Sequence, residues 1–181
     1  MPGTVGRADA FTAEFAEKTE ARNPFSREVA ISIKLILCAA DLEDENSVTI
    51  AAYAQNIAEM TRAPLVVVYV VESRETLDEL HAISGIVGVE TQKVVAAAEK
   101  TMQQFISENF TSVSATGRVA VGAAAREILG AARETNADLI VMGTRGKKGI
   151  ERMLLGSVAA NVVKDAAVPV LTIPIGVARR P

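Results

Sequence analysis

Four glycines lie within residues 143 to 156, and four basic residues stand among them, in the stretch VMGTRGKKGIERMLLGSVAANVVKD. Glycine adopts backbone angles that turn N–H groups toward a common point, where they can bind an anion. Gly156 and Ser157 also open a predicted helix, whose first N–H groups are free and lie at its positive end. The spacing Gly143-x2-Gly146-x9-Gly156-Ser157 therefore predicts two N–H-rich segments that hold a phosphate group from two sides.

Each residue of this motif also has an ordinary structural explanation. Gly143 can be a turn after a strand, Ser157 can cap its helix, and the basic side chains can form a solvated surface. The combination of all of them at the end of a predicted strand favours the anion site. The sequence has neither the P-loop pattern G-x4-G-K-[ST] nor the G-x-G of dinucleotide-binding proteins, so it fits neither class by motif.

Apolar runs and helical patterns alternate along the chain and must position these glycines. Strands are expected at 30–40, 63–72, 112–122, 137–143 and 168–175, and helices at 46–62, 87–110, 123–136 and 156–167. In the first helix, Ile50, Tyr53, Ala54, Ile57 and Ala58 are expected on one face. This alternation is typical of an α/β fold, with a five-stranded parallel sheet and helices on both faces.

The composition supports a single domain of this class. The 181 residues are 49% hydrophobic and only 4% aromatic, without Trp, so the core must consist of Ala, Val, Ile and Leu. Residues 30–181 are expected to form the domain. Residues 1–29 are expected to be an N-terminal extension, either a tail or a docking helix with Phe11 and Phe15 on one face.

Charge and cysteine content limit the partners. A net charge of -3 argues against a nucleic-acid-binding surface. The single Cys38 excludes a disulfide within the chain, and with only one histidine, His81, a Cys/His metal cluster is not expected. Cys38 is expected to be a small buried hydrophobic residue. No apolar run is long enough to span a membrane, so we expect a cytoplasmic protein without a membrane partner.

Ligands of open parallel sheets bind at the carboxyl ends of the strands, where the strand order reverses. Asp41, Val70 and Met142 lie at the ends of predicted strands. If the first and fourth strands are neighbours, Asp41 and the loop that begins at Gly143 face one crevice.

From about residue 31 to residue 175, the sequence resembles the universal stress protein family. The glycine spacing matches the motif associated with ATP binding in that family, and the segments KLILCAAD, LVVVYVVE and VAVGAAAREILGAARETNADLIVMGTRG match its strands and helices. The resemblance implies strand order 3-2-1-4-5 in a Rossmann-like sheet, similar to adenine nucleotide alpha hydrolases.

The resemblance also implies roles for individual positions. Ala39 would belong to the nucleotide site, and Asp41, two residues later, would contact the ribose. The backbone of Val70 would meet the adenine edge, and Met142 would pack near the nucleoside. The ribose and phosphates would be surrounded by Gly143, Arg145, Gly146, Gly156, Ser157 and Val158. Mg²⁺ or Mn²⁺ would accompany a triphosphate.

The ribose side departs from the family pattern in two places. Ala39 stands where the family often has Pro, and Leu42 and Glu43 replace a common Gly-Ser pair. The acidic residues 43–45 near the mouth of the site can ligate a metal ion or form a solvated loop.

The leading functional hypothesis is a stress-response or regulatory protein that binds ATP or AMP and acts on an unknown protein partner. An apolar last strand at 168–175 predicts a homodimer that covers this sheet edge. Because no catalytic constellation is evident, hydrolysis is expected to be slow at most. The alternatives are a slow ATPase or nucleotidyl-transfer enzyme that uses the same pocket, and a protein-binding dimer whose pocket is empty.

Overall fold

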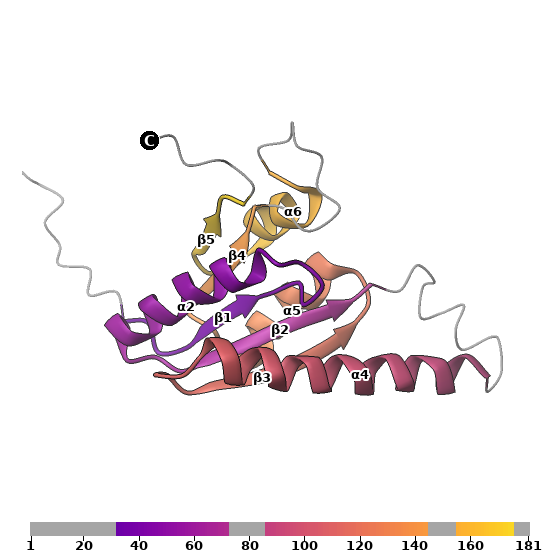
Figure 1. Ribbon diagram of the computed structural model, residues 1–181. Coiled ribbons are helices and arrows are strands. Elements are labelled where there is room, and N and C mark those ends of the chain that lie inside the picture. The colour runs from indigo at the N-terminus through magenta and orange to yellow at the C-terminus, as the bar shows by residue number, and fades with distance from the viewer. Residues whose placement is uncertain (1–31, 73–85, 145–154, 176–181) are drawn as a thin grey trace, which may run out of the picture. The chain divides into compact units, whose positions relative to one another are not determined.

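The structure is a computed structural model that describes residues 32–72, 86–144 and 155–175, with side chains from residue 92 onward in the second segment (Figure 1). The chain divides into two compact units, Met1–Ile31 and Ser32–Pro181, and all described residues lie in the second. The expected N-terminal extension, 1–29, lies outside the described residues and stays a prediction.

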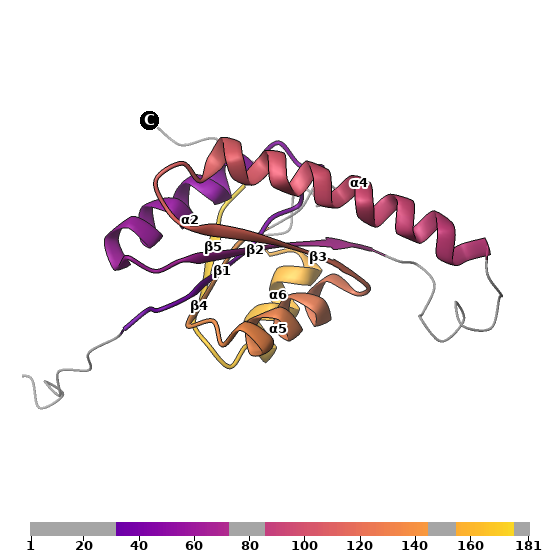
Figure 2. The same cartoon turned by 90° about the horizontal axis from the view of Figure 1, so that it is seen from below.

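The described residues form a parallel sheet in the strand order β3-β2-β1-β4-β5. Helices α2 and α4 cover one face, and α5 and α6 cover the other (Figure 2). This confirms the predicted five-stranded α/β fold and its strand order. The elements are β1 (Ile36–Ala39), α2 (Ser47–Thr61), β2 (Leu65–Val71), α4 (Ile86–Asn109), β3 (Ala115–Val121), α5 (Ala124–Thr135), β4 (Leu139–Gly143), α6 (Ser157–Asp165) and β5 (Val170–Ile173).

All five strands are shorter than their predicted ranges, and β1 and β5 are the shortest, with four residues each. The run at 168–175 contains Pro169 and Pro174, and β5 occupies only the four residues between them. Proline has no N–H for the sheet ladder, so it limits a strand at each end. In the described part of the run at 30–40, β1 occupies Ile36–Ala39, where it pairs with both β2 and β4.

Helix α2 shows one error in the predicted buried face. Tyr53 was expected to face the core, but it is 40% exposed. The buried stripe is centred on Ala51, Ala54 and Ala58. Successive helical residues are rotated by about 100°, so Tyr53 lies to the side of this stripe. The small alanines, rather than the phenol ring, define how the helix meets the sheet.

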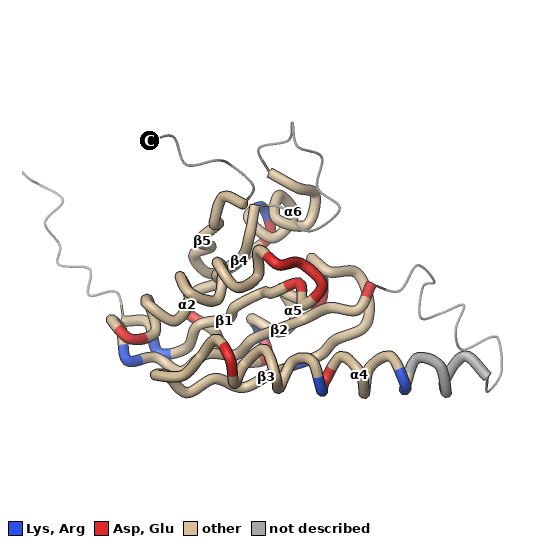
Figure 3. The backbone as a smooth tube through the Cα atoms, in the orientation of Figure 1, with Lys and Arg blue, Asp and Glu red and all other residues tan. Residues whose placement is uncertain are grey.

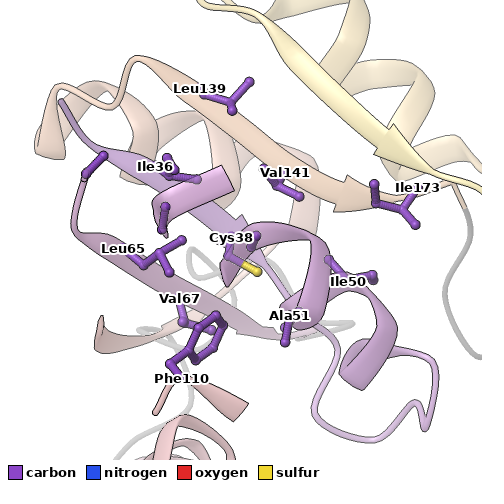
Figure 4. Packing of buried hydrophobic residues seen from close by; sticks show 14 of the residues in the cluster. Ile36, Cys38, Ile50, Ala51, Leu65, Val67, Phe110, Leu139, Val141 and Ile173 are labelled. Atoms are coloured by element: carbon purple, nitrogen blue, oxygen red, sulfur yellow. The ribbon is translucent and has the colours of Figure 1, made fainter. Parts of the chain in front are cut away.

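The core consists of two apolar clusters, one on each face of the sheet. Cys38 belongs to the cluster under α2 and α4 and is fully buried, as Figure 4 shows. Burial raises the pKa of its thiol to about 12. The prediction that Cys38 is a small buried hydrophobic residue is confirmed.

Helix α4 packs on β3 over Gly117. A Cβ added at Gly117 would clash with Met102 and crowd Ile106, so the glycine permits the close approach of helix and strand. In the part of the chain that the structure describes, no helix is both long and apolar enough to cross a bilayer.

At the amino edge of the sheet, Asp138 links two chain segments by hydrogen bonds. Its Oδ2 atom accepts hydrogen bonds from the backbone N–H groups of Lys34 (2.7 Å) and Leu35 (3.1 Å). The Asp138 N–H in turn donates to the Leu35 carbonyl (2.9 Å). The segment that enters β1 is thereby tied to the segment that enters β4.

Candidate functional site

The strand order reverses between β1 and β4, which are direct neighbours. Ala39 pairs with Met142 in the register of these two strands. Asp41 follows β1, and Gly143 is the last residue of β4. The structure thus confirms that the first and fourth strands are adjacent and that their carboxyl ends meet at one edge, where ligands of such sheets bind.

Strand β2 continues past the end of β1 and leaves part of its backbone open. Among the described residues, the last backbone hydrogen bond between the β1 segment and β2 joins the Ala40 N–H to the Val68 carbonyl (3.0 Å). Backbone groups alternate sides along a strand, so the N–H and C=O of Val70 point the same way as those of Val68. Val70 therefore presents one donor and one acceptor to the space beyond β1.

The two halves of the glycine motif are joined by a backbone hydrogen bond. The Gly156 N–H donates to the Thr144 carbonyl oxygen (2.7 Å), so the start of α6 lies against the end of β4. Arg145 and Gly146 lie outside the described residues, as does the rest of 145–154, and their predicted roles stay predictions. The bond shows that this eleven-residue connection, 145–155, begins and ends at one place on the carboxyl edge.

Helix α6 begins with N–H groups that have no partner within the helix. Its N-cap is Gly156, with φ -70° and ψ 161°, and no side chain caps the helix. Ser157 is the first helical residue, so the alternative that Ser157 serves as the N-cap is wrong. The N–H groups of Ser157, Val158 and Ala159 have no partner within the helix, which leaves a positively polarised end at the carboxyl edge.

Gly143 is the last residue of β4, within the predicted strand at 137–143, and it does not adopt the positive φ that a turning glycine can take. The positive-φ glycine among the described residues is Gly122 (φ 149°). Because β4 pairs with β5 up to Gly143↔Ile173, the strand continues one step further than a turn at Gly143 would allow.

Apolar residues predicted for the site share one face of the sheet. Ala39 and Met142 are buried, at 8% and 5% exposure, in the cluster under α5 and α6. Val70 and Val158 are partly buried and pack against the same cluster. We call these four residues, which come from β1, β2, β4 and α6, the apolar wall.

Asp41 is held in a tight turn at the end of β1. Its Oδ1 atom accepts the Glu43 N–H (3.1 Å), and its carbonyl oxygen accepts the Ser47 hydroxyl (2.6 Å) and the Asp44 N–H (2.9 Å). Figure 3 shows the acidic residues of this turn as a red segment between β1 and α2. The turn orients the Asp41 carboxylate without enclosing it, since Asp41 is only partly buried.

Tyr69 is a neighbour of this turn that sequence reasoning missed. Its hydroxyl donates to Glu43 Oε1 at 3.5 Å, a long hydrogen bond. The pKa of Tyr69 is raised, first by burial and then by the negative charges of Glu43 and Asp41. The only signal in the sequence was a tyrosine inside an otherwise aliphatic strand.

The comparisons with known proteins agree with this architecture. The family model described as the universal stress protein family matches residues 32–174. The chain belongs to the universal stress protein family. Universal stress protein MJ0531 of Methanocaldococcus jannaschii is 35% identical over 132 residues, which cover 70% of this chain and 74% of the relative.

Solved structures of this family share the fold. The hypothetical protein MJ0577 gives a TM-score of 0.71 at 23% identity, with 82% of this chain and 100% of that chain covered. A universal stress protein in complex with cAMP gives a TM-score of 0.58 at 21% identity, with 79% and 98% covered.

The acidic turn at residues 43–45 of this universal stress protein does not form a cluster of metal ligands by itself. Within the described ranges, no group of three or more His, Cys, Asp or Glu side chains could hold a metal ion. Asp44 instead accepts two hydrogen bonds from Asn46, from the backbone N–H (2.9 Å) and from Nδ2 (2.7 Å). The Asp44 carboxylate thereby stabilises the turn that leads into α2.

A cavity of about 300 Å³ lies away from this site. It opens between the C-terminal ends of α5 and α6, next to the residues that enter β4 and β5, and hence at the amino edge. We do not assign it to the candidate site, because the glycine motif, Asp41 and Val70 all lie at the carboxyl edge. Its lining residues are Leu129, Ala132, Arg133, Asn136, Ala137, Ile140, Asp165, Ala167 and Val168.

Proposed function

We propose that this universal stress protein binds adenine nucleotides, ATP or AMP, at the carboxyl edge of its sheet and acts in regulation or stress response through a protein partner. The observation that carries the proposal is the hydrogen bond between the Gly156 N–H and the Thr144 carbonyl. This bond brings the uncapped end of α6 to the carboxyl ends of β1 and β4. The cAMP complex of a family member supports the ligand class.

The adenine ring is assigned to Val70 and the apolar wall. The Watson–Crick edge of adenine offers one donor and one acceptor, which match the backbone C=O and N–H of Val70. The faces of the ring are apolar and suit the side chains of Val70, Met142 and Val158. The base therefore needs no charged side chain.

The ribose is assigned to Asp41. Because the Glu43 N–H already holds Oδ1, the carboxylate is oriented before the ligand arrives. Oδ2 remains available to accept hydrogen bonds from vicinal ribose hydroxyls, which are good donors to a carboxylate.

The phosphates are assigned to the start of α6. The N–H groups of Ser157, Val158 and Ala159 supply donors, the helix dipole favours the negative charge, and the Ser157 hydroxyl adds a further donor. Gly143, Arg145 and Gly146 are proposed to complete the phosphate site from the other side. We assign Mg²⁺ or Mn²⁺ to the triphosphate itself, since the described carboxylates do not form a metal site.

The dimer is assigned to the 168–175 segment. Strand β5 is at the edge of the sheet, and Leu171 in it is 36% exposed. An apolar edge with open backbone groups is covered when it pairs with a second copy of itself.

A thermal-shift titration tests the nucleotide proposal. The protein is heated with ATP, ADP, AMP or cAMP, each with and without Mg²⁺. Ligand at one hundred times its Kd is expected to stabilise the fold by about 2.7 kcal/mol. Absence of a shift with all of these nucleotides would contradict the proposal. Turnover of saturating ATP is measured in parallel, and phosphate release well above the buffer rate would favour the enzyme alternative.

A further inference from the structure

Thr144 is a buried polar residue that joins three segments of the carboxyl edge. It is only 9% exposed. Its N–H donates to the Ile173 carbonyl (2.9 Å), and its carbonyl accepts the Gly156 N–H (2.7 Å). Its hydroxyl oxygen accepts the Ile175 N–H at 3.4 Å. A single residue thus contacts the start of α6, the end of β5 and the residue two positions beyond β5.

These contacts place Thr144 between two features with separate proposed roles. Gly156 begins the proposed phosphate site, and Ile173 to Ile175 belong to the edge segment assigned to the dimer. The backbone of Thr144 is hydrogen-bonded to both Gly156 and Ile173. Movement of the α6 start relative to β4 therefore acts directly on the hydrogen bonds that hold the end of β5.

We infer that Thr144 is a positioning residue that couples nucleotide occupancy at the start of α6 to the order of Ile173–Ile175 at the sheet edge. This inference rests on the proposed function. A phosphate bound to the first-turn N–H groups fixes Gly156, Gly156 fixes the Thr144 peptide, and the Thr144 hydroxyl then holds the Ile175 amide. Such coupling is reciprocal, so order at the edge also favours the nucleotide.

The long Ile175–Thr144 hydrogen bond gives the inference a direction. At 3.4 Å it exceeds the usual N–H···O range of about 2.7–3.2 Å, so it can shorten when the site is ordered. Order at this site makes opening of the bond rarer, which slows the exchange of the Ile175 amide with water. A shorter bond also moves the amide proton signal downfield.

The test is amide exchange by NMR on the full-length, ¹⁵N-labelled protein, free and with saturating AMP. Occupancy is verified from the shift of the Ser157 amide. In the parent protein, AMP is expected to slow exchange at Ile175 about fivefold or more. In Thr144→Val, which keeps the shape but removes the acceptor, the AMP-dependent difference at Ile175 is expected to vanish. Thr144→Ser, which keeps the hydroxyl, is expected to retain it.

Thr135→Val is the matched control, because the Thr135 hydroxyl bonds the Ala131 carbonyl within α5 (2.7 Å), away from this edge. It is expected to behave as the parent. If AMP saturates the parent protein and exchange at Ile175 is unchanged, the inference is overturned while the proposed function stands. If Thr144→Val keeps the parent difference, the hydroxyl is not the link and the inference is also overturned. If no nucleotide binds the parent protein, the inference and the proposed function both fail. This outcome is read from the parent protein and does not depend on any variant.

Discussion

Two aspartates, Asp138 and Asp41, lie at opposite edges of the same sheet and have different roles. Asp138 at the amino edge binds two backbone N–H groups more than a hundred residues away in sequence. The Asp41 carboxylate at the carboxyl edge accepts one hydrogen bond, from the backbone N–H of Glu43, only two residues away. The first carboxylate fastens distant segments together, and the second is oriented by its own turn.

The difference between the edges extends beyond these two residues. At the amino edge, strand entries are tied to each other. At the carboxyl edge, β2 extends past the end of β1 at Val70, and α6 starts without a side-chain cap. Polar backbone groups left open in this way usually have a ligand or water as their partner. We therefore propose that the amino edge contributes stability and that the carboxyl edge binds the ligand.

The largest expected effect is that of Gly156→Val on binding. The backbone angles of Gly156 are accessible to any residue, so the fold should tolerate the change. The side chain would stand where the phosphate meets the start of α6. Loss of about two charge-assisted hydrogen bonds weakens AMP binding on the order of a hundredfold.

Calorimetric titration with AMP measures this effect. Gly130→Val is the matched control, because a Cβ at Gly130 on α5 meets nothing within 4 Å. Equal affinities for the two variants would mean that the start of α6 does not hold the phosphate.

Asp138→Ala is expected to act on stability and not on binding. It removes the acceptor of two backbone N–H groups, which costs about 2 kcal/mol of unfolding free energy. Urea denaturation measures the loss, with the exposed Asp165→Ala as the control. If AMP affinity of the folded variant falls as well, the separation of the two edges is wrong.

Asp41→Asn is expected to have the opposite profile. Asparagine supports the same turn, so stability should stay near that of the parent. Replacing the carboxylate by a neutral acceptor weakens AMP binding by about tenfold. The 2′,3′-dideoxy analogue provides the control, because without ribose hydroxyls it should bind the parent and the variant equally. A tenfold loss with that analogue too would place Asp41 elsewhere than at the ribose.

The smallest expected effect is that of Gly149→Ala. Gly149 belongs to the nine-residue spacer of the motif and lies outside the described residues. As a spacer residue it should change AMP affinity by less than about threefold, under 1 kcal/mol. A loss as large as that of Gly156→Val would show that the spacer itself contacts the ligand.

Much of the fold could be predicted from apolar periodicity, since each strand is an aliphatic run and each helix has its own stripe. The strand ends were less predictable, because pairing partners and prolines decide them, as in β5. The predicted buried face of α2 was wrong at Tyr53, because three alanines, and not this larger residue, make the contact with the sheet.

At the candidate site, the start of α6 could be predicted from local spacing, whereas contacts between residues distant in sequence could not. The predicted helix at 156–167 matches the position of α6, but the motif did not show that Gly156 is the N-cap. The roles of Thr144 and Tyr69 could not be predicted, because they depend on partners that only the fold brings near, Ile175 and Glu43. Hydrogen bonds of this kind leave no periodic trace in a sequence.

The most direct test of the central claim is an NMR titration of the labelled protein with AMP, read at both edges of the sheet. The account predicts that the amide signals of Val70, Ser157 and Val158 shift in proportion to occupancy, while those of Lys34 and Leu35 stay in place. Saturable shifts confined to the amino edge, or to the residues that line the cavity between α5 and α6, would contradict it.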